Sequence, residues 1–265
     1  MTGRRDDRRE REGEAPRSVW LFGLHAVRDA LLNPRRERMR LIATRNALDR
    51  LGEEALAAGG LTPELADARR FAAPLDPQSV HQGAALEVRP LDWGPLAKVC
   101  APPKAGGPGP RPLAVLLDRV TDPHNVGAVL RSAEVFGALA VIAPARHAAP
   151  ETGALAKAAS GALERQPYLR VTNLARAMAE LRDLGYVLVG LAGEAETDLA
   201  EAVAGDAPLA VALGAEGPGL RELTRATCDR LARVPATGGF GSLNVSNAAA
   251  VALYAARTSG SGQTA

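Results

Sequence analysis

Three separated stretches in the second half of the chain combine glycines with small polar side chains, a composition suited to binding a small ligand. Their sequences are DRVTDPHNVGAVLRSAEVFG (118–137), PLAVALGAEGPGLREL (208–223) and RVPATGGFGSLNVSNAAAVAL (233–253). Each lies just past an apolar run that predicts a strand, and open α/β sheets place their ligands beyond the carboxyl ends of their strands. The three stretches are therefore the candidate binding segments.

The first stretch carries polar groups from a turn onto a helix. Asp122 and Pro123 predict the turn, and Asn125 is expected to cap the helix that follows. Arg131 falls off the apolar stripe of that helix. Taken alone, Asn125 can be merely a cap and Arg131 merely a solvated residue.

The second stretch is a glycine-rich turn between a buried strand and a helix that Gly219 is expected to open. Gly214 and Gly217 flank Glu216, and glycines let a backbone approach a ligand closely. A phosphate-loop nucleotidase would need Lys followed by Ser or Thr, which is absent, and the glycines lack dinucleotide-fold spacing. A plain tight turn is the alternative.

The third stretch delivers small polar residues to the start of an alanine-rich helix. Ser242, Asn244 and Ser246 surround Leu243, a set that could hold a ligand with both polar and apolar parts. The same residue types favour helix starts for structural reasons alone.

The elements that position these stretches alternate between strand and helix. Strands are predicted at 113–118, 139–143, 186–191 and 208–214, and helices at 125–137, 173–185 and 247–257. Such alternation predicts an α/β fold with a parallel sheet that helices cover on both faces.

A smaller α/β unit is expected before this region. Leu24, Val27 and Leu31 lie on one helical stripe, and Pro34 ends that helix. A strand at 41–43, a helix at 47–60 and a strand at 84–91 follow. The predicted organisation is a disordered arm (1–17), a first domain (18–92), a linker rich in proline and glycine (93–112), a second domain (113–259) and a disordered tail (260–265).

The composition excludes several classes of protein. Of 265 residues, 46% are hydrophobic and 23% are charged, and no apolar run approaches the ~18 residues of a membrane-spanning helix. The N-terminus lacks the pattern of a secretory signal, so we expect a cytoplasmic protein. Cys100 and Cys228 are too few for a disulfide framework or a zinc site, and no metal is expected. A net charge of +2 requires any affinity for RNA to be local.

Together the three stretches resemble the three motifs of the SpoU family of RNA ribose 2′-O-methyltransferases, within the SPOUT superfamily. The order and spacing of the motifs also fit, and the similarity covers roughly residues 18–258. In the first domain, FGLHAVRDALLNP and VHQGAALEVRPL are similar to the substrate-binding domain of bacterial members that modify a guanosine of 23S rRNA.

This resemblance implies a parallel-sheet SPOUT domain with a deep trefoil knot, preceded by a small α/β (L30e-like) RNA-binding domain. It implies S-adenosylmethionine (AdoMet) as the cofactor and a homodimer that shares residues between active sites. The implied catalytic residues are Asn125, Arg131, Glu216, Ser242 and Asn244. The implied cofactor-binding residues are Gly214, Glu216, Gly217, Val234, Ser242, Leu243 and Asn244.

In the family, the arginine that matches Arg131 is assigned to the 2′-hydroxyl. A guanidinium with a pKa above ~12 is a poor proton acceptor, so we favour a role in holding phosphate and stabilising alkoxide charge. A general-base role with help from the RNA phosphate stays open, and His124 is an alternative base.

The resemblance leaves the RNA substrate open. A tRNA ribose methyltransferase and a non-catalytic ribosome assembly factor on the same fold are the alternatives to a 23S rRNA enzyme. The first domain favours rRNA, and a candidate RNA-binding patch there contains Arg35, Arg36, Arg38 and Arg40. Aromatic content of 3% argues against stacking on single strands as the main mode of binding.

Overall fold

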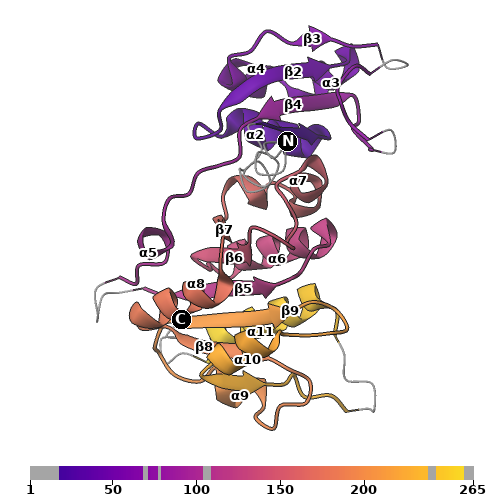
Figure 1. Ribbon diagram of the computed structural model, residues 1–265. Coiled ribbons are helices and arrows are strands. Elements are labelled where there is room, and N and C mark those ends of the chain that lie inside the picture. The colour runs from indigo at the N-terminus through magenta and orange to yellow at the C-terminus, as the bar shows by residue number, and fades with distance from the viewer. Residues whose placement is uncertain (1–17, 68–70, 77–78, 104–108, 238–242, 260–265) are drawn as a thin grey trace, which may run out of the picture. The chain divides into compact units, whose positions relative to one another are not determined.

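The computed structural model describes residues 18–67, 71–76, 79–103, 109–237 and 243–259 (Figure 1). The chain divides between Leu91 and Asp92 into two compact units. Ser242, one of the predicted site residues, lies outside the described residues, as do the predicted arm and the predicted tail.

The N-terminal unit contains a four-stranded sheet in the order β1-β4-β2-β3. Its strands are β1 (Val19–Phe22), β2 (Arg38–Ala43), β3 (Glu64–Leu65) and β4 (Ala84–Val88), and its helices are α2 (Leu24–Leu32), α3 (Arg45–Leu51) and α4 (Glu53–Gly59). Only the β2–β3 pair is parallel. Leu21, Leu31, Leu41 and Leu86 are fully buried and form the centre of the core.

The single helix predicted over 47–60 is wrong, because the chain forms two helices there. Gly52 lies between them with a φ of 82°, a left-handed conformation that interrupts the α-helical hydrogen bonds. Thr44 caps the first helix by accepting a hydrogen bond from the backbone N–H of Ala47. Strand β1 was also missed by the sequence analysis.

The predicted arginine patch is largely occupied by internal contacts. Arg36 is buried and donates to the carbonyl of Arg89 at 2.9 Å, and Arg38 donates to the carbonyl of Leu31. Arg40 makes two hydrogen bonds to the Glu64 carboxylate. Burial therefore removes Arg36 from the surface, whereas Arg35 and Arg40 are exposed, and the RNA-binding role of the patch stays a prediction.

The C-terminal unit is built on a six-stranded, fully parallel sheet in the order β10-β8-β9-β5-β6-β7. The strands are β5 (Leu113–Asp118), β6 (Ala140–Pro144), β7 (Tyr168–Val171), β8 (Val187–Leu191), β9 (Leu209–Gly214) and β10 (Arg230–Ala232). Strands β5, β6 and β9 are almost entirely buried, as their continuous apolar sequences predict.

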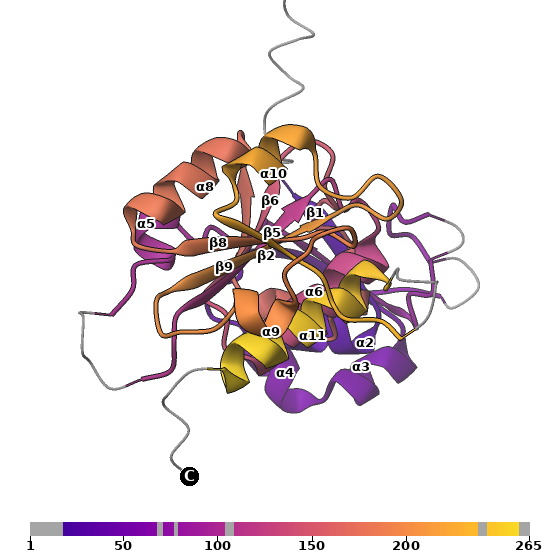
Figure 2. The same cartoon turned by 90° about the horizontal axis from the view of Figure 1, so that it is seen from below.

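Helices cover both faces of this sheet, which confirms the predicted α/β architecture. The helices are α5 (Leu96–Val99), α6 (Pro123–Val135), α7 (Gly153–Ala159), α8 (Leu174–Asp183), α9 (Leu199–Ala202), α10 (Glu222–Thr227) and α11 (Val245–Thr258), with a 3₁₀ turn at Ala162–Glu164. Helices α5, α8 and α10 lie on one face, and α6, α9 and α11 lie on the other (Figure 2). The sequence missed β7 and β10, which are short strands at the two edges.

The linker predicted over 93–112 is wrong at its beginning, because that segment is part of the C-terminal core. Helix α5 packs against α8, with Leu96 and Cys100 buried. The hydroxyl of Tyr186 donates to the carbonyl of Cys100 at 2.9 Å, and burial raises the pKa of the Cys100 thiol to about 12. The C-terminal unit therefore begins near residue 92.

A fragment of residues 92–259 is expected to be more stable than a fragment of residues 101–259. The shorter fragment lacks α5, and each fully buried apolar side chain contributes roughly 1.5–3 kcal/mol. We expect its free energy of unfolding to be lower by about 2–5 kcal/mol in urea denaturation. Equal denaturation midpoints and slopes would show that α5 is an independent linker after all.

Candidate active site

The three candidate stretches meet in one polar cluster. The side-chain N–H of Asn244 donates to the side-chain oxygen of Asn125 at 2.9 Å and to Oε1 of Glu216 at 2.5 Å. The amide of Asn125 donates to the same Glu216 oxygen at 3.3 Å. One carboxylate oxygen thus accepts from both asparagines, although 119 positions separate them along the chain.

The sheet and two helices place these three side chains. Asp118 at the end of β5 pairs with Gly214 at the end of β9, so the segments that follow begin side by side. Helices α6 and α11 pack against each other, and Asn125 and Asn244 lie at their N-terminal ends. Glu216 therefore faces two helix N-termini, whose partial positive charge attracts a carboxylate.

Asn125 does not cap helix α6 as predicted. Asp122 is the cap, accepting a hydrogen bond from the backbone N–H of His124 at 2.9 Å, and Pro123 occupies the first turn. The Asn125 side chain is consequently available for Glu216. Asn244 does cap α11, since its side-chain oxygen accepts from the backbone N–H of Ser246.

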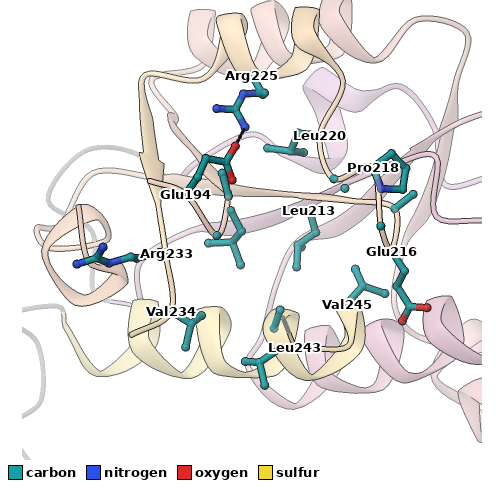
Figure 3. A pocket seen from close by; sticks show the side chains of 18 of the residues that line it. Glu194, Leu213, Glu216, Pro218, Leu220, Arg225, Arg233, Val234, Leu243 and Val245 are labelled. Atoms are coloured by element: carbon teal, nitrogen blue, oxygen red, sulfur yellow. Dashed lines mark hydrogen bonds and ion pairs between the residues drawn. The ribbon is translucent and has the colours of Figure 1, made fainter. Parts of the chain in front are cut away.

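A cavity of about 400 Å³ opens beside the polar cluster (Figure 3). This volume falls within the range of small-molecule sites. Five of the predicted cofactor-binding residues line it: Gly214, Glu216, Gly217, Val234 and Leu243. Asn244 belongs to the adjoining cluster. The cavity walls come from the segments that follow β8, β9 and β10, at the carboxyl edge of the sheet.

The cavity has apolar walls and charged groups at its rim. Leu213, Leu220 and Val245 are buried in its walls, whereas Leu243 keeps 47% of its surface exposed. Figure 3 shows Glu216 on one side of the cavity and Glu194 on another. This arrangement suits a ligand with an apolar part and several polar groups.

An ion pair between Glu194 and Arg225 at the rim was missed by the sequence analysis (Figure 3). A hydrogen bond from its own backbone N–H and the Arg225 guanidinium hold the pKa of the Glu194 carboxyl below its usual value. Glu194 follows strand β8, so its place at a strand's carboxyl end was the signal that could have identified it.

Gly214 serves a tight turn of the chain itself. A Cβ at this position would lie 2.0 Å from the carbonyl carbon of Gly219, so a side chain cannot be accommodated. Gly217 and Gly219 have φ values of 84° and 67°, which glycine adopts without strain. The next helix begins at Glu222, later than the predicted start at Gly219.

Asp118, at the end of strand β5, anchors this turn to the sheet. It is fully buried and accepts hydrogen bonds from the backbone N–H and the Nε of Arg221, at 3.0 and 2.6 Å, and from the hydroxyl of Thr224 at 2.7 Å. The segment that lines the cavity is thereby fixed to strand β5.

Asp118→Ala is expected to lower the free energy of unfolding by about 2–4 kcal/mol, because it leaves buried donors without an acceptor. Affinity for the expected cofactor, AdoMet, should fall as well, since the turn loses its anchor. The matched control is Asp198→Ala, which removes a half-exposed carboxylate paired with Arg233 and should change stability by less than about 1 kcal/mol. If urea denaturation showed that the two variants lose equal free energies of unfolding, the anchoring role of Asp118 would be contradicted.

Arg131 lies apart from the polar cluster. It is exposed on α6, six residues after Asn125, which places it about 240° around the helix. It makes no hydrogen bond or ion pair with any residue that the structure describes. The structure thus brings together Asn125, Glu216 and Asn244 but not Arg131.

None of the described helices is long and apolar enough to cross a membrane. In the same residues, no group of three or more His, Cys, Asp or Glu side chains is placed to hold a metal ion.

An open parallel sheet with a ligand cavity and a polar cluster at its carboxyl edge defines an α/β domain of the small-molecule-binding, enzyme-like class. Residues 112–254 match the model of the SpoU rRNA Methylase family, and the chain belongs to this family.

Similar proteins span nearly the whole chain. The chain is 38% identical to the 23S rRNA (guanosine-2′-O-)-methyltransferase RlmB of Vibrio vulnificus (strain CMCP6) over 252 residues, covering 89% of this chain and 95% of the relative. Identity to the protein of that name from Ralstonia nicotianae is 41% over 243 residues, covering 91% and 95%. The crystal structure of the SpoU methyltransferase AviRb from Streptomyces viridochromogenes with AdoMet superimposes with a TM-score of 0.73 at 25% identity, covering 97% of this chain and 93% of that one.

Proposed function

We propose that this protein transfers a methyl group from AdoMet to the ribose 2′-hydroxyl of a guanosine in 23S rRNA. The observation that carries the proposal is the meeting of Asn125, Glu216 and Asn244 at the rim of a ligand-sized cavity. The names of the relatives, which align over almost their full length, support the substrate. The crystal structure of AviRb with AdoMet supports the cofactor.

The chemistry of the cavity fits AdoMet, which carries an adenine ring, a ribose, a sulfonium and an amino acid group. Apolar walls that include Val234 and Leu243 suit the adenine and the aliphatic portions. The glycine-rich turn at 214–217 lets the polar edges of a ligand approach the backbone closely, and the carboxylate of Glu216 suits a cationic group. Ser242 and Asn244 are proposed to complete the pocket. We propose that AdoMet binds without a metal ion.

When bound, AdoMet supplies an electrophilic methyl group, and the protein must present a nucleophilic oxygen in line with it. The hydrogen bonds between Asn125, Glu216 and Asn244 fix their polar groups before the substrate arrives, and such positioning supplies much of the rate. Arg131 is proposed to hold the neighbouring phosphate and to stabilise the charge that develops on the ribose oxygen.

We also propose that the protein is a homodimer in which Arg131 serves the partner's active site. Arg131 and Val135 are four residues apart and share one face of α6, where Val135 is 77% exposed. Val251 and Tyr254 of the adjacent helix α11 are also exposed, and Tyr254 contacts the ring of Phe136 edge-on. An exposed apolar face on two packed helices suits a symmetric interface.

Family membership supports three further proposals. We propose that the C-terminal domain forms a deep trefoil knot, in which the C-terminal segment passes through a loop of the chain. The N-terminal unit binds the RNA substrate. The protein acts in the cytoplasm, where ribosomal RNA is found.

The test in cells is to map 2′-O-methylation across ribosomal and transfer RNA in a strain that lacks the gene. We expect one guanosine of 23S rRNA to lose its methyl group and to regain it when the gene is restored. Loss confined to tRNA would replace the proposed substrate, and an unchanged methylation map would favour a non-catalytic role.

A further inference from the structure

The cavity uses only half of the carboxyl edge of the large sheet. Its lining follows strands β8, β9 and β10, which lie on one side of the sheet. Strands β5 and β6 continue the same edge on the other side, beyond the polar cluster. If an RNA presents its ribose to this cluster, the rest of the RNA can therefore lie along the part of the edge that follows β5 and β6.

Three exposed side chains able to carry positive charge, Arg119, Arg146 and His147, follow these two strands. Arg119 comes directly after Asp118, which pairs with Gly214, so it begins beside the turn that contains Glu216. Arg146 and His147 follow Ala145, the first residue after β6, which is the strand next to β5. The three residues therefore lie along one continuous stretch of the edge.

None of the three makes a hydrogen bond or an ion pair with the part of the chain that the structure describes. Other arginines of the same unit are paired, as Arg165 is with Glu134 and Arg182 is with Asp229. Arginines without a counter-charge leave a local positive potential, which attracts a polyanion.

The backbone at two of these residues is strained. Arg119 and His147 have φ values of 62° and 61°, in the left-handed region that residues with a side chain rarely adopt. Both positions would be relaxed by glycine, yet each keeps a large cationic or titratable side chain. Such strain is concentrated at functional sites.

We propose that Arg119, Arg146 and His147 form a surface that binds the phosphodiester backbone of the RNA and directs the target ribose toward Asn125. The inference rests on the proposed function and extends it by naming where the substrate lies. Contacts to phosphate position a nucleic acid without reading its sequence, and folded RNA is recognised largely through its backbone and shape.

The test measures binding of the purified full-length protein to unmodified 23S rRNA by filter retention over a range of salt concentrations. Arg119→Gly and His147→Gly should each raise Tm by a few degrees, because they relieve the left-handed backbone. Each should weaken RNA binding, and Arg119→Gly should do so roughly tenfold. Arg119→Gly should also lower the slope of log K against log salt concentration by about one, the value expected for one lost phosphate contact. The Kd for AdoMet should not change.

The matched control is Lys98→Ala, which removes an exposed charge at the opposite edge of the sheet. Lys98 lies on α5 near Cys100, whose carbonyl bonds Tyr186 just before strand β8 begins. This variant should bind RNA like the wild type.

The two proposals can fail separately. If both glycine variants bind and methylate 23S rRNA as the wild type does, the surface is wrong and the proposed function stands. If the wild type binds this RNA without methylating it, the proposed function is wrong, whereas weaker binding by the glycine variants would still support the surface.

Discussion

Arg131→Ala is expected to lower kcat for methyl transfer by roughly 10²–10³-fold, the loss seen when a group that stabilises transition-state charge is removed. The fold should survive, because Val126, Val129, Leu130 and Ala133 pack α6 against the core while Arg131 is exposed. AdoMet affinity should also survive, since Arg131 does not line the cavity. Single-turnover methylation, thermal denaturation and cofactor titration on one preparation measure all three.

Arg131→Lys is the conservative control. An ammonium keeps the charge but loses the planar fork that can hold a phosphate and an oxyanion together, so rescue should be poor. Near-normal transfer by Arg131→Ala would refute the catalytic assignment. A lowered Tm, with activity falling only in proportion to folded protein, would make Arg131 structural.

The second large effect is expected for Leu243→Arg, which should weaken AdoMet binding by at least about 100-fold. The substitution places a long charged side chain against the apolar part of the cavity, where the cofactor's apolar groups are proposed to bind. Stability should change little, because Leu243 is 47% exposed. Calorimetry measures the affinity, and Leu243→Ala, a smaller apolar change, should cost only about tenfold. Tight binding by the Leu243→Arg protein would remove this residue from the pocket.

Mixing the Arg131→Ala and Leu243→Arg proteins tests whether the active site is shared between subunits. In a mixed dimer, the Arg131→Ala subunit keeps an intact cavity, and the Leu243→Arg subunit supplies an intact Arg131. If the arginine acts across the interface, random mixing should restore about a quarter of wild-type activity. If it acts within its own subunit, every mixed dimer has two defective sites and the mixture stays inactive.

The general fold could be predicted because the sequence pattern and the tertiary structure agree. Continuous apolar runs such as Leu113–Asp118 became buried parallel strands. Predictions failed where a residue is buried by residues that are distant from it in the sequence. Leu96 and Cys100 sit in a stretch that resembles a linker, and only their packing against α8 makes it part of the core. The edge strand Arg230–Ala232 is too short to show a period.

The candidate site could be predicted in composition but not in geometry. Asn125, Glu216 and Asn244 were identified, yet the sequence could not show that one carboxylate oxygen would accept from both asparagines. Asp122 and Asn125 are both good helix caps, and the position of Pro123 in the first turn decides between them. The pairing of Glu194 with Arg225 depends on a contact between segments 31 positions apart, which local patterns do not encode.

The central claim is methylation of a ribose in 23S rRNA, and it is tested most directly with purified protein, unmodified 23S rRNA and AdoMet labelled in its methyl group. The labelled RNA is digested to nucleosides, which are separated and identified. We predict that the label appears only in 2′-O-methylguanosine, at close to one methyl group per RNA, and that the Leu243→Arg protein gives none. Label on a base, label in tRNA but not in 23S rRNA, or no transfer by protein that binds AdoMet would contradict the account.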